Sequence, residues 1–181
     1  MSVKRFFVQH IKFDGVAYTK GTPIDTDEEY HIICSDTPKK FYPEAKDVVT
    51  KNWPGKDGLS VYVPQNAKIN DFEWEVSFLY SGSRYDMRTN INNFVAYLYG
   101  RTSLVDPPHK YSARLAVYDD YLSEGYKDVR VASVEFGTWW DSPDCDDEAI
   151  AEFKVKFHVY DPSTVIIPQY ENAHISDLSW T

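Results

Sequence analysis

The sequence has few of the residues on which redox, metal and membrane functions depend. It contains two cysteines and eight glycines in 181 residues. Cys34 and Cys145 belong to no Cys-x-x-Cys or Cys/His spacing, so we expect two free thiols, with a disulfide between them left open. No apolar run approaches the ~20 residues of a membrane-spanning helix. The N-terminus has no apolar core of signal-peptide length, so we expect a chain made in the cytoplasm.

The motifs of common catalytic and binding sites are also missing. Gly55-Lys56-Asp57-Gly58 has neither the length nor the following Lys-Ser/Thr of a phosphate-binding loop, and the five histidines match no metal-binding spacing. The acidic run 141–148 lacks the order of an EF-hand loop, so a solvated turn is the better interpretation than a cation site. The sequence therefore predicts no enzyme, no catalytic residue, no cofactor and no metal.

The charge balance excludes a further class of partner. The chain has 28 acidic against 19 basic residues and a formal net charge of −9. Binding to a DNA duplex or to an anionic membrane requires clustered Lys and Arg. We therefore expect neither specific nucleic-acid binding nor membrane binding.

What the sequence does have is aromatic residues, at 16% of the chain with 14 Tyr and 5 Trp. Such a content is typical of a β-rich protein with a large contact surface. Trp139 and Trp140 end a candidate strand at 129–140, where adjacent side chains face opposite sides. We expect one of them in the core and the other at an interface. Trp53, in a Gly-rich turn, is a second candidate interface residue, because exposed aromatics anchor protein contacts or stack on sugars.

The clearest local structure lies between residues 72 and 100. Bulky aromatic and apolar residues alternate with polar ones from Phe72 to Tyr80, as in a half-buried strand. Ser81-Gly82-Ser83 is expected to stop the strand, with Ser83 as the N-cap of an amphipathic helix and Asp86 in its first turn. Gly100 is placed to end that helix in a left-handed conformation.

The remaining elements are strands. The pattern predicts strands at 30–34, 47–50, 59–63, 111–117, 129–140 and 149–159. Apolar residues on both faces of 129–140 indicate a central strand or one that changes face at a bulge. Residues 21–29 are interpreted as an acidic loop, and residues 6–11 as a strand or an arm. The expected fold class is α+β, mostly β: an antiparallel β-sandwich or split barrel with one helix packed on it.

Three motifs in order carry a resemblance to a known family. They are the turn Trp53-Pro54-Gly55-Lys56-Asp57-Gly58-Leu59, the segment Leu104-Val105-Asp106-Pro107-Pro108 leading into a strand, and the final strand from Phe153 to Pro162. Together they resemble the N-terminal, ring-forming domain of phage distal tail proteins, which are related to tail-tube proteins. The resemblance covers residues 45–162. Residues 1–44 are then an N-terminal arm and first strands, and residues 163–181 a C-terminal tail, in one compact domain overall.

The resemblance implies a structural protein of a phage or prophage virion tail, made in the bacterial host cytoplasm. Its partners would be itself, in a homo-hexameric ring, together with the tail-tube protein and the tail-tip or baseplate protein. The candidate residues for an oligomer or partner interface are Trp53, Asp57, Trp139 and Trp140. Six copies at −9 each carry −54, and an acidic lumen would repel DNA and let it slide past. The alternatives are a tail-tube or tail-terminator subunit, or a carbohydrate-binding β-sandwich.

Overall fold

The structure is a computed structural model that describes residues 4–13, 16–38, 44–55, 57–62, 68–101, 113–141, 147–172 and 174–180. The expected Asp106-Pro107-Pro108 turn, Cys145 and most of the acidic run 141–148 lie outside the described residues. No helix in the described part of the chain is long and apolar enough to cross a membrane.

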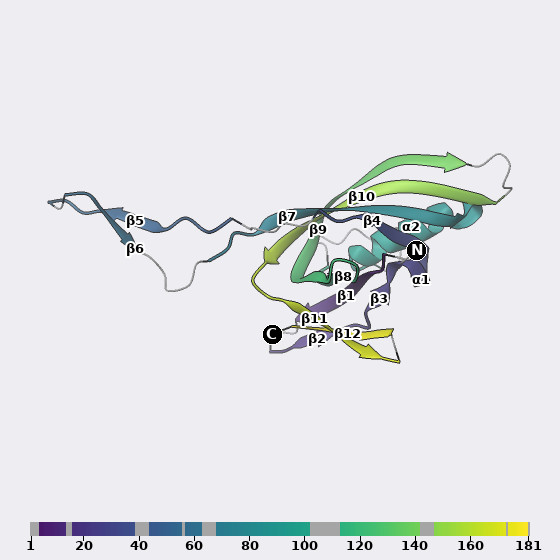
Figure 1. Ribbon diagram of the computed structural model, residues 1–181, viewed down its shortest axis with the longest axis horizontal. Coiled ribbons are helices and arrows are strands. Elements are labelled where there is room, and N and C mark those ends of the chain that lie inside the picture. Colours follow the sequence, from purple (N-terminus) through teal and green to yellow (C-terminus); the bar gives the residue numbers. More distant parts are fainter. Residues whose placement is uncertain are drawn as a thin grey trace.

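The body is an open, antiparallel sheet of eight strands (Figure 1). The strands run in the order β2-β1-β8-β9-β10-β7-β4, with β3 paired to β1. Their bounds are β1 Phe6–Phe13, β2 Tyr18–Lys20, β3 Ile24–Asp25, β4 Ile32–Asp36, β7 Phe72–Ser83, β8 Leu115–Asp119, β9 Glu124–Asp141 and β10 Glu148–Asp161. The expected class is confirmed: the protein is α+β and mostly antiparallel β, with one long helix packed on an open sheet.

Strand β7 and helix α2, Arg84–Leu98, form as the sequence predicts. The strand runs on to Ser83, three residues beyond the expected stop at Tyr80. The Ser83 hydroxyl then accepts a hydrogen bond from the Tyr85 amide at 3.2 Å, which caps the helix. Gly100 ends the helix with φ +72°, a conformation that favours glycine.

The main core lies between α2 and the sheet. Phe78 of β7 and Phe153 of β10 stack with ring centroids 5.6 Å apart, and Phe94 of α2 meets Phe78 edge-on at 5.4 Å. All three side chains are fully buried. Helix α2 is thereby fixed over β7 and β10.

The N-terminal segment belongs to the body. Strand β1 lies between β8 and the β2 and β3 strands, and its Phe6 and Val8 are fully buried, so residues 6–11 are a strand and not an arm. The expected acidic loop at 21–29 is wrong over its second half. Residues Thr26–Tyr30 form a short helix, α1, because the Asp25 carboxylate caps it by accepting from the Asp27 amide at 3.0 Å.

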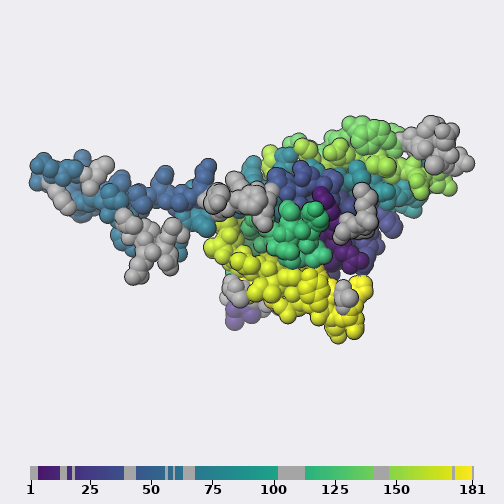
Figure 2. Space-filling view, viewed as in Figure 1, coloured from purple at the N-terminus to yellow at the C-terminus, as the bar shows by residue number. Residues whose placement is uncertain are grey.

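The expected C-terminal tail forms a β-hairpin, β11 Ile166–Glu171 and β12 His174–Trp180. Its Ile166, Ile175 and Leu178 pack on apolar residues of β1 and β8 in a second cluster. In Figure 2 this yellow hairpin lies along the lower side of the body. The described part of this segment, residues 163–172 and 174–180, is therefore integral to the fold.

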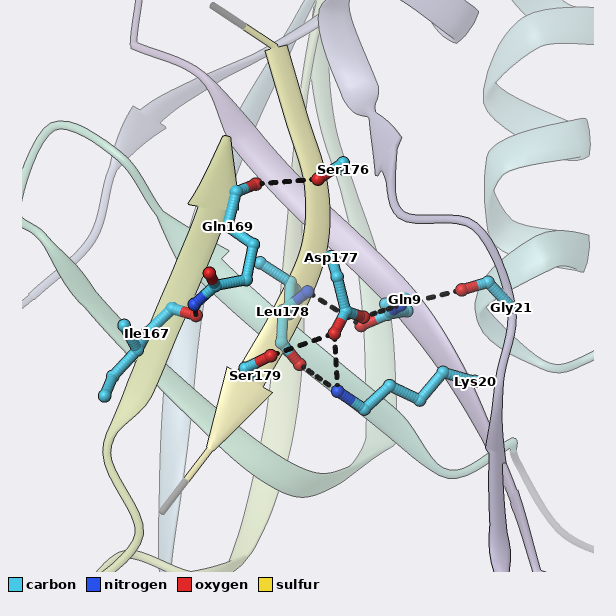
Figure 3. A network of polar contacts seen from close by, with 9 residues as sticks. All are labelled: Gln9, Lys20, Gly21, Ile167, Gln169, Ser176, Asp177, Leu178 and Ser179. Atoms are coloured by element: carbon cyan, nitrogen blue, oxygen red, sulfur yellow. Dashed lines mark hydrogen bonds and ion pairs between the residues drawn. The ribbon is translucent and has the colours of Figure 1, made fainter. Parts of the chain in front are cut away.

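A polar network fastens this hairpin to the N-terminal strands (Figure 3). The buried Gln9 side chain donates to the Gly21 carbonyl at 2.7 Å and to Asp177 at 2.8 Å. Lys20 donates to the other Asp177 oxygen at 2.8 Å and to the Leu178 carbonyl at 3.0 Å. The first and last strands of the chain are thus joined.

Residues 44–55, 57–62 and 68–70 leave the body as a narrow projection, which we call the arm (Figures 1 and 2). Among the described strands, β5, Val49–Asn52, and β6, Leu59–Tyr62, pair only with each other. An isolated bridge between Ala45 and Ile69 marks the base of the arm. Both strands were expected, but their projection from the body was not.

Candidate interaction surfaces

The distal half of β9 is shaped by a bulge. Phe136 lies opposite Phe153 and Trp139 opposite Ala151, so two residues of β9 face the single residue Glu152 of β10. A side chain at Gly137 would place its Cβ 2.9 Å from the Glu152 carbonyl oxygen, so this close approach requires glycine. The extra residue puts Phe136 and Trp139 on the same face of the sheet as the buried Phe153 and Ala151.

These two side chains face the core layer without being covered. Phe136 is 64% exposed and Trp139 55% exposed. They form one wall of an apolar groove of about 230 Å³, which we call the α2–β9 groove. Met87 and Ile91 of α2 form the facing wall. The groove exists because α2 lies over β7 and β10 and does not extend over this part of β9.

Trp140 lies on the other face of the sheet. It is opposite Ile150, which is itself exposed, and its own side chain is 51% exposed. The two tryptophans do face opposite sides, but the expectation that one of them is in the core is wrong. Trp139 faces α2, but within the described residues its side chain is left more than half exposed.

The outer edge of β9 is a third feature. On the side away from β10, the described strands pair with β9 only as far as Val129, through β8. Residues 130–141 therefore present backbone donors and acceptors with no strand beside them among the described residues. Such an edge is a template for pairing with another chain.

The arm carries an apolar face. Val49 and Tyr62 are a cross-strand pair, and each is 69% exposed. Beyond them Trp53 is 49% exposed, with the Lys51 ammonium 3.7 Å from its ring centroid. Asp57 is exposed at the tip. Trp53 and Asp57 thus lie on the arm, while Trp139 and Trp140 end β9 on the far side of the body (Figure 1), so the four predicted interface residues form two separate surfaces.

The face of the sheet opposite α2 is covered by the β11–β12 hairpin over β1 and β8. Over β7, β9 and β10 it is mainly charged, apart from the exposed Trp140, Ile150 and Tyr160. Lys154 pairs with Glu75 at 3.0 Å, Lys156 with Glu73 at 3.9 Å. The hydrogen bond that Lys154 donates to the Glu75 carboxylate raises the pKa of Lys154. Acids outnumber bases on this face, which carries Asp71, Glu73, Glu75, Glu135 and Glu152 against Arg130, Lys154 and Lys156.

The buried titratable groups serve the fold. Asp119 accepts from the amides of Tyr121 and Leu122 and from the Thr37 hydroxyl, which closes the β8–β9 turn. Burial raises the pKa of Cys34 to about 12. Burial also lowers the pKa of His10, whose ring bonds the Tyr97 carbonyl at 2.8 Å. Among the described residues, no three His, Cys, Asp or Glu side chains gather to hold a metal ion.

Sequence reasoning found the aromatic residues of these surfaces but not the groove or the projecting arm. One signal was present: a glycine, Gly137, inside a long strand pattern marks a bulge or a close backbone approach. No family model matches the chain, and no curated protein matches it.

Proposed function

We propose that this protein is a structural subunit of a phage or prophage tail, of the distal tail type, that joins the tail tube to the tail tip as a homo-hexameric ring. The sequence resemblance supports the proposal, and so does the architecture of an open antiparallel sheet with one long helix on it. The observation that carries it is the edge of β9 from residue 130 to residue 141, which has no partner among the described strands.

The opposite edge of the sheet supplies the matching surface. There β4 pairs with β7 only from Ser77 to Tyr80 and has no outer neighbour in the described part of the chain. Strand directions alternate from β9 through β10 and β7 to β4, so β4 of the next copy runs antiparallel to β9 when two sheets join edge to edge. A contact between two different edges is head-to-tail, and such contacts close into rings when the rotation permits.

The charged part of the face opposite α2, formed by β7, β9 and β10, would line the lumen of this ring. Its excess of acids over bases repeats in every copy and gives a wall that repels phosphates. The apolar face, covered by α2, would face outward. The ring would therefore carry DNA without binding it.

Electron microscopy and native mass spectrometry of the full chain test the proposal. We expect rings of the wild type, alone or on addition of the tail-tube protein. Ala132→Lys places a charge on the exposed β9 edge and should abolish the rings, whereas Val165→Lys, at an exposed position away from both edges, should leave them unchanged. A wild type that forms no ring under either condition and binds glycans on an array would instead support the carbohydrate-binding alternative.

A further inference from the structure

The α2–β9 groove combines exposed aromatic rings with polar side chains that bind nothing else. Phe136 and Trp139 form one wall, and each is more than half exposed. Arg88 and Asn92 of α2 and Glu152 of β10 also line the groove. Within the described residues, none of these three polar side chains makes a hydrogen bond or a close ion pair. The groove therefore offers an apolar surface bordered by a guanidinium, an amide and a carboxylate that can bind a ligand.

These three polar groups define the chemistry of that ligand. The guanidinium of Arg88 only donates hydrogen bonds, the carboxylate of Glu152 only accepts them, and the amide of Asn92 does both. A hydroxyl group both donates and accepts, so a ligand with several hydroxyls can bind all three side chains. The formal charges of Arg88 and Glu152 are opposite and cancel, which favours a neutral ligand over a charged one.

Other classes of ligand fit only part of the groove. A wholly apolar side chain of a protein partner would remove water from the three polar groups without replacing its hydrogen bonds, which weakens binding. A nucleotide has an aromatic base, but its phosphates would be repelled by a chain with a net charge of −9. A saccharide ring has an apolar face of C–H groups, which can pack on an aromatic side chain, and it carries hydroxyls around its edge.

We propose that the α2–β9 groove binds one ring of a neutral saccharide. The sugar ring packs on Trp139 and Phe136, and its hydroxyls bind Arg88, Asn92 and Glu152. The groove volume of about 230 Å³ lies below the roughly 300–1,000 Å³ of sites for drug-sized ligands, so the other sugars of an oligosaccharide extend into solvent. The site is complete within one chain, so the inference goes beyond the proposed function and does not depend on a ring.

Calorimetric titration of the full chain with defined oligosaccharides tests the site. The neutral probes are cellotriose, maltotriose, galactotriose and the N-acetylglucosamine trimer, and the anionic probe is trigalacturonate. The sugars are used at millimolar concentration, the range expected for a ligand that buries a single ring. We expect at least one neutral probe to bind, and to bind more tightly than trigalacturonate.

Variants of the groove assign the binding to it. Trp139→Ala should weaken binding about tenfold, because it removes apolar area that the sugar ring covers, and Trp139→Phe should retain most of the affinity. Asn92→Leu keeps the side-chain volume and should also weaken binding, whereas an apolar ligand would bind this variant more tightly. Trp140→Ala is the matched control and should leave the affinity unchanged, since Trp140 is 51% exposed on the opposite face of the sheet. Circular dichroism checks that each variant is folded.

The outcomes separate this proposal from the proposed function. Absence of binding by every neutral probe would overturn it, and so would tighter binding of trigalacturonate. Binding that Trp139→Ala and Asn92→Leu leave unchanged would place the sugar elsewhere on the chain and overturn the assignment to this groove. Native mass spectrometry of the same samples records the ring. Rings that bind no sugar would overturn the saccharide site alone, whereas groove-dependent sugar binding without rings would support the site and count against the ring.

Discussion

Phe136 and Phe153 lie opposite each other on β9 and β10, with ring centroids 6.1 Å apart, yet the exposed fractions of their side chains differ greatly. Phe153 is fully buried under α2, whereas Phe136 is 64% exposed. The two rings share a face and a contact. What separates them is the position of α2, whose Phe94 packs on Phe153 while Phe136 is left in the open α2–β9 groove.

Truncation of the two rings should therefore have unequal effects on stability. Phe153→Ala removes a ring from the closed core and should lower the free energy of unfolding by about 3–5 kcal/mol. Phe136→Ala removes an exposed ring and should lower it by less than about 1 kcal/mol. Urea denaturation followed by tryptophan fluorescence measures both values at a concentration where the protein is monomeric. Equal losses would mean that the groove is closed in solution.

The strand–helix unit from Phe72 to Leu98 could be predicted because its signals are local. The alternation of β7, the capping hydroxyl of Ser83 and the glycine at position 100 each act within a few residues of the element that they define. The helix α1 was missed because its three acidic residues at 27, 28 and 29, with Asp25 just before them, resemble a loop. Asp25 caps the N-terminus of this helix, and the left-handed residue His31 ends it.

The exposure of Phe136 and Trp139 could not be predicted, because it depends on which strands the helix covers. Alternation assigns a side chain to a face of the sheet but does not say whether that face is covered. The bulge at Gly137 adds to the difficulty, since it shifts Trp139 onto the face that simple alternation gives to its neighbours. The same reasoning applies to Trp53, where the sequence gives a turn but not its distance from the body.

Loss of the Gln9 side chain should lower the free energy of unfolding, because this side chain joins β1 to β12. It is buried, donates to Asp177 at 2.8 Å and accepts from the Leu178 amide at 3.2 Å. Gln9→Leu keeps the volume but leaves the Leu178 amide buried without its acceptor, which should cost about 1–3 kcal/mol. The hydrogen-exchange rates of the β12 amides should rise in the same variant. Gln169→Leu, which removes only an exposed 3.4 Å bond to the Ile167 carbonyl, is the matched control and should change neither quantity by much.

Acid should loosen the C-terminal hairpin before the main core opens. Burial alone would raise the pKa of Asp177, but hydrogen bonds from Lys20, Gln9 and Ser179 outweigh it and hold the pKa below 3.8. A carboxylate with a lowered folded pKa contributes stability that is fully present above its unfolded pKa. This contribution is lost as the pH falls through the folded value. We expect the hairpin amide signals from His174 to Trp180 to shift and lose protection below about pH 4, as followed by NMR.

The variant Asp177→Asn separates this group from the other carboxylates of the chain. It should weaken the protection of the hairpin amides from hydrogen exchange at pH 7. Lowering the pH below about 4 should then change these amides little further. An unchanged acid response in Asp177→Asn would assign the loosening to another group. Asp161 is the alternative, because its carboxylate accepts from Ser163 and Thr164 just before β11 and its pKa is also lowered.

Cys34 should be inert to thiol reagents in the folded protein. It is fully buried on β4, and burial, together with the nearby Asp119 charge, raises its pKa to about 12 from a usual value of 9.0. The thiolate is the reactive form, so its population at neutral pH falls about a thousandfold, in addition to the loss of access. In a Cys145→Ser background, where Cys34 is the single thiol, Ellman's reagent should react only as fast as the protein opens. Full reaction should follow at once in denaturant.

Because opening of the native protein is expected to be rate-limiting, raising the reagent concentration should leave the native rate unchanged. A native rate that rises in proportion to reagent, and that exceeds the rate set by the global unfolding equilibrium measured in urea, would show that the β4 edge exposes this thiol without unfolding.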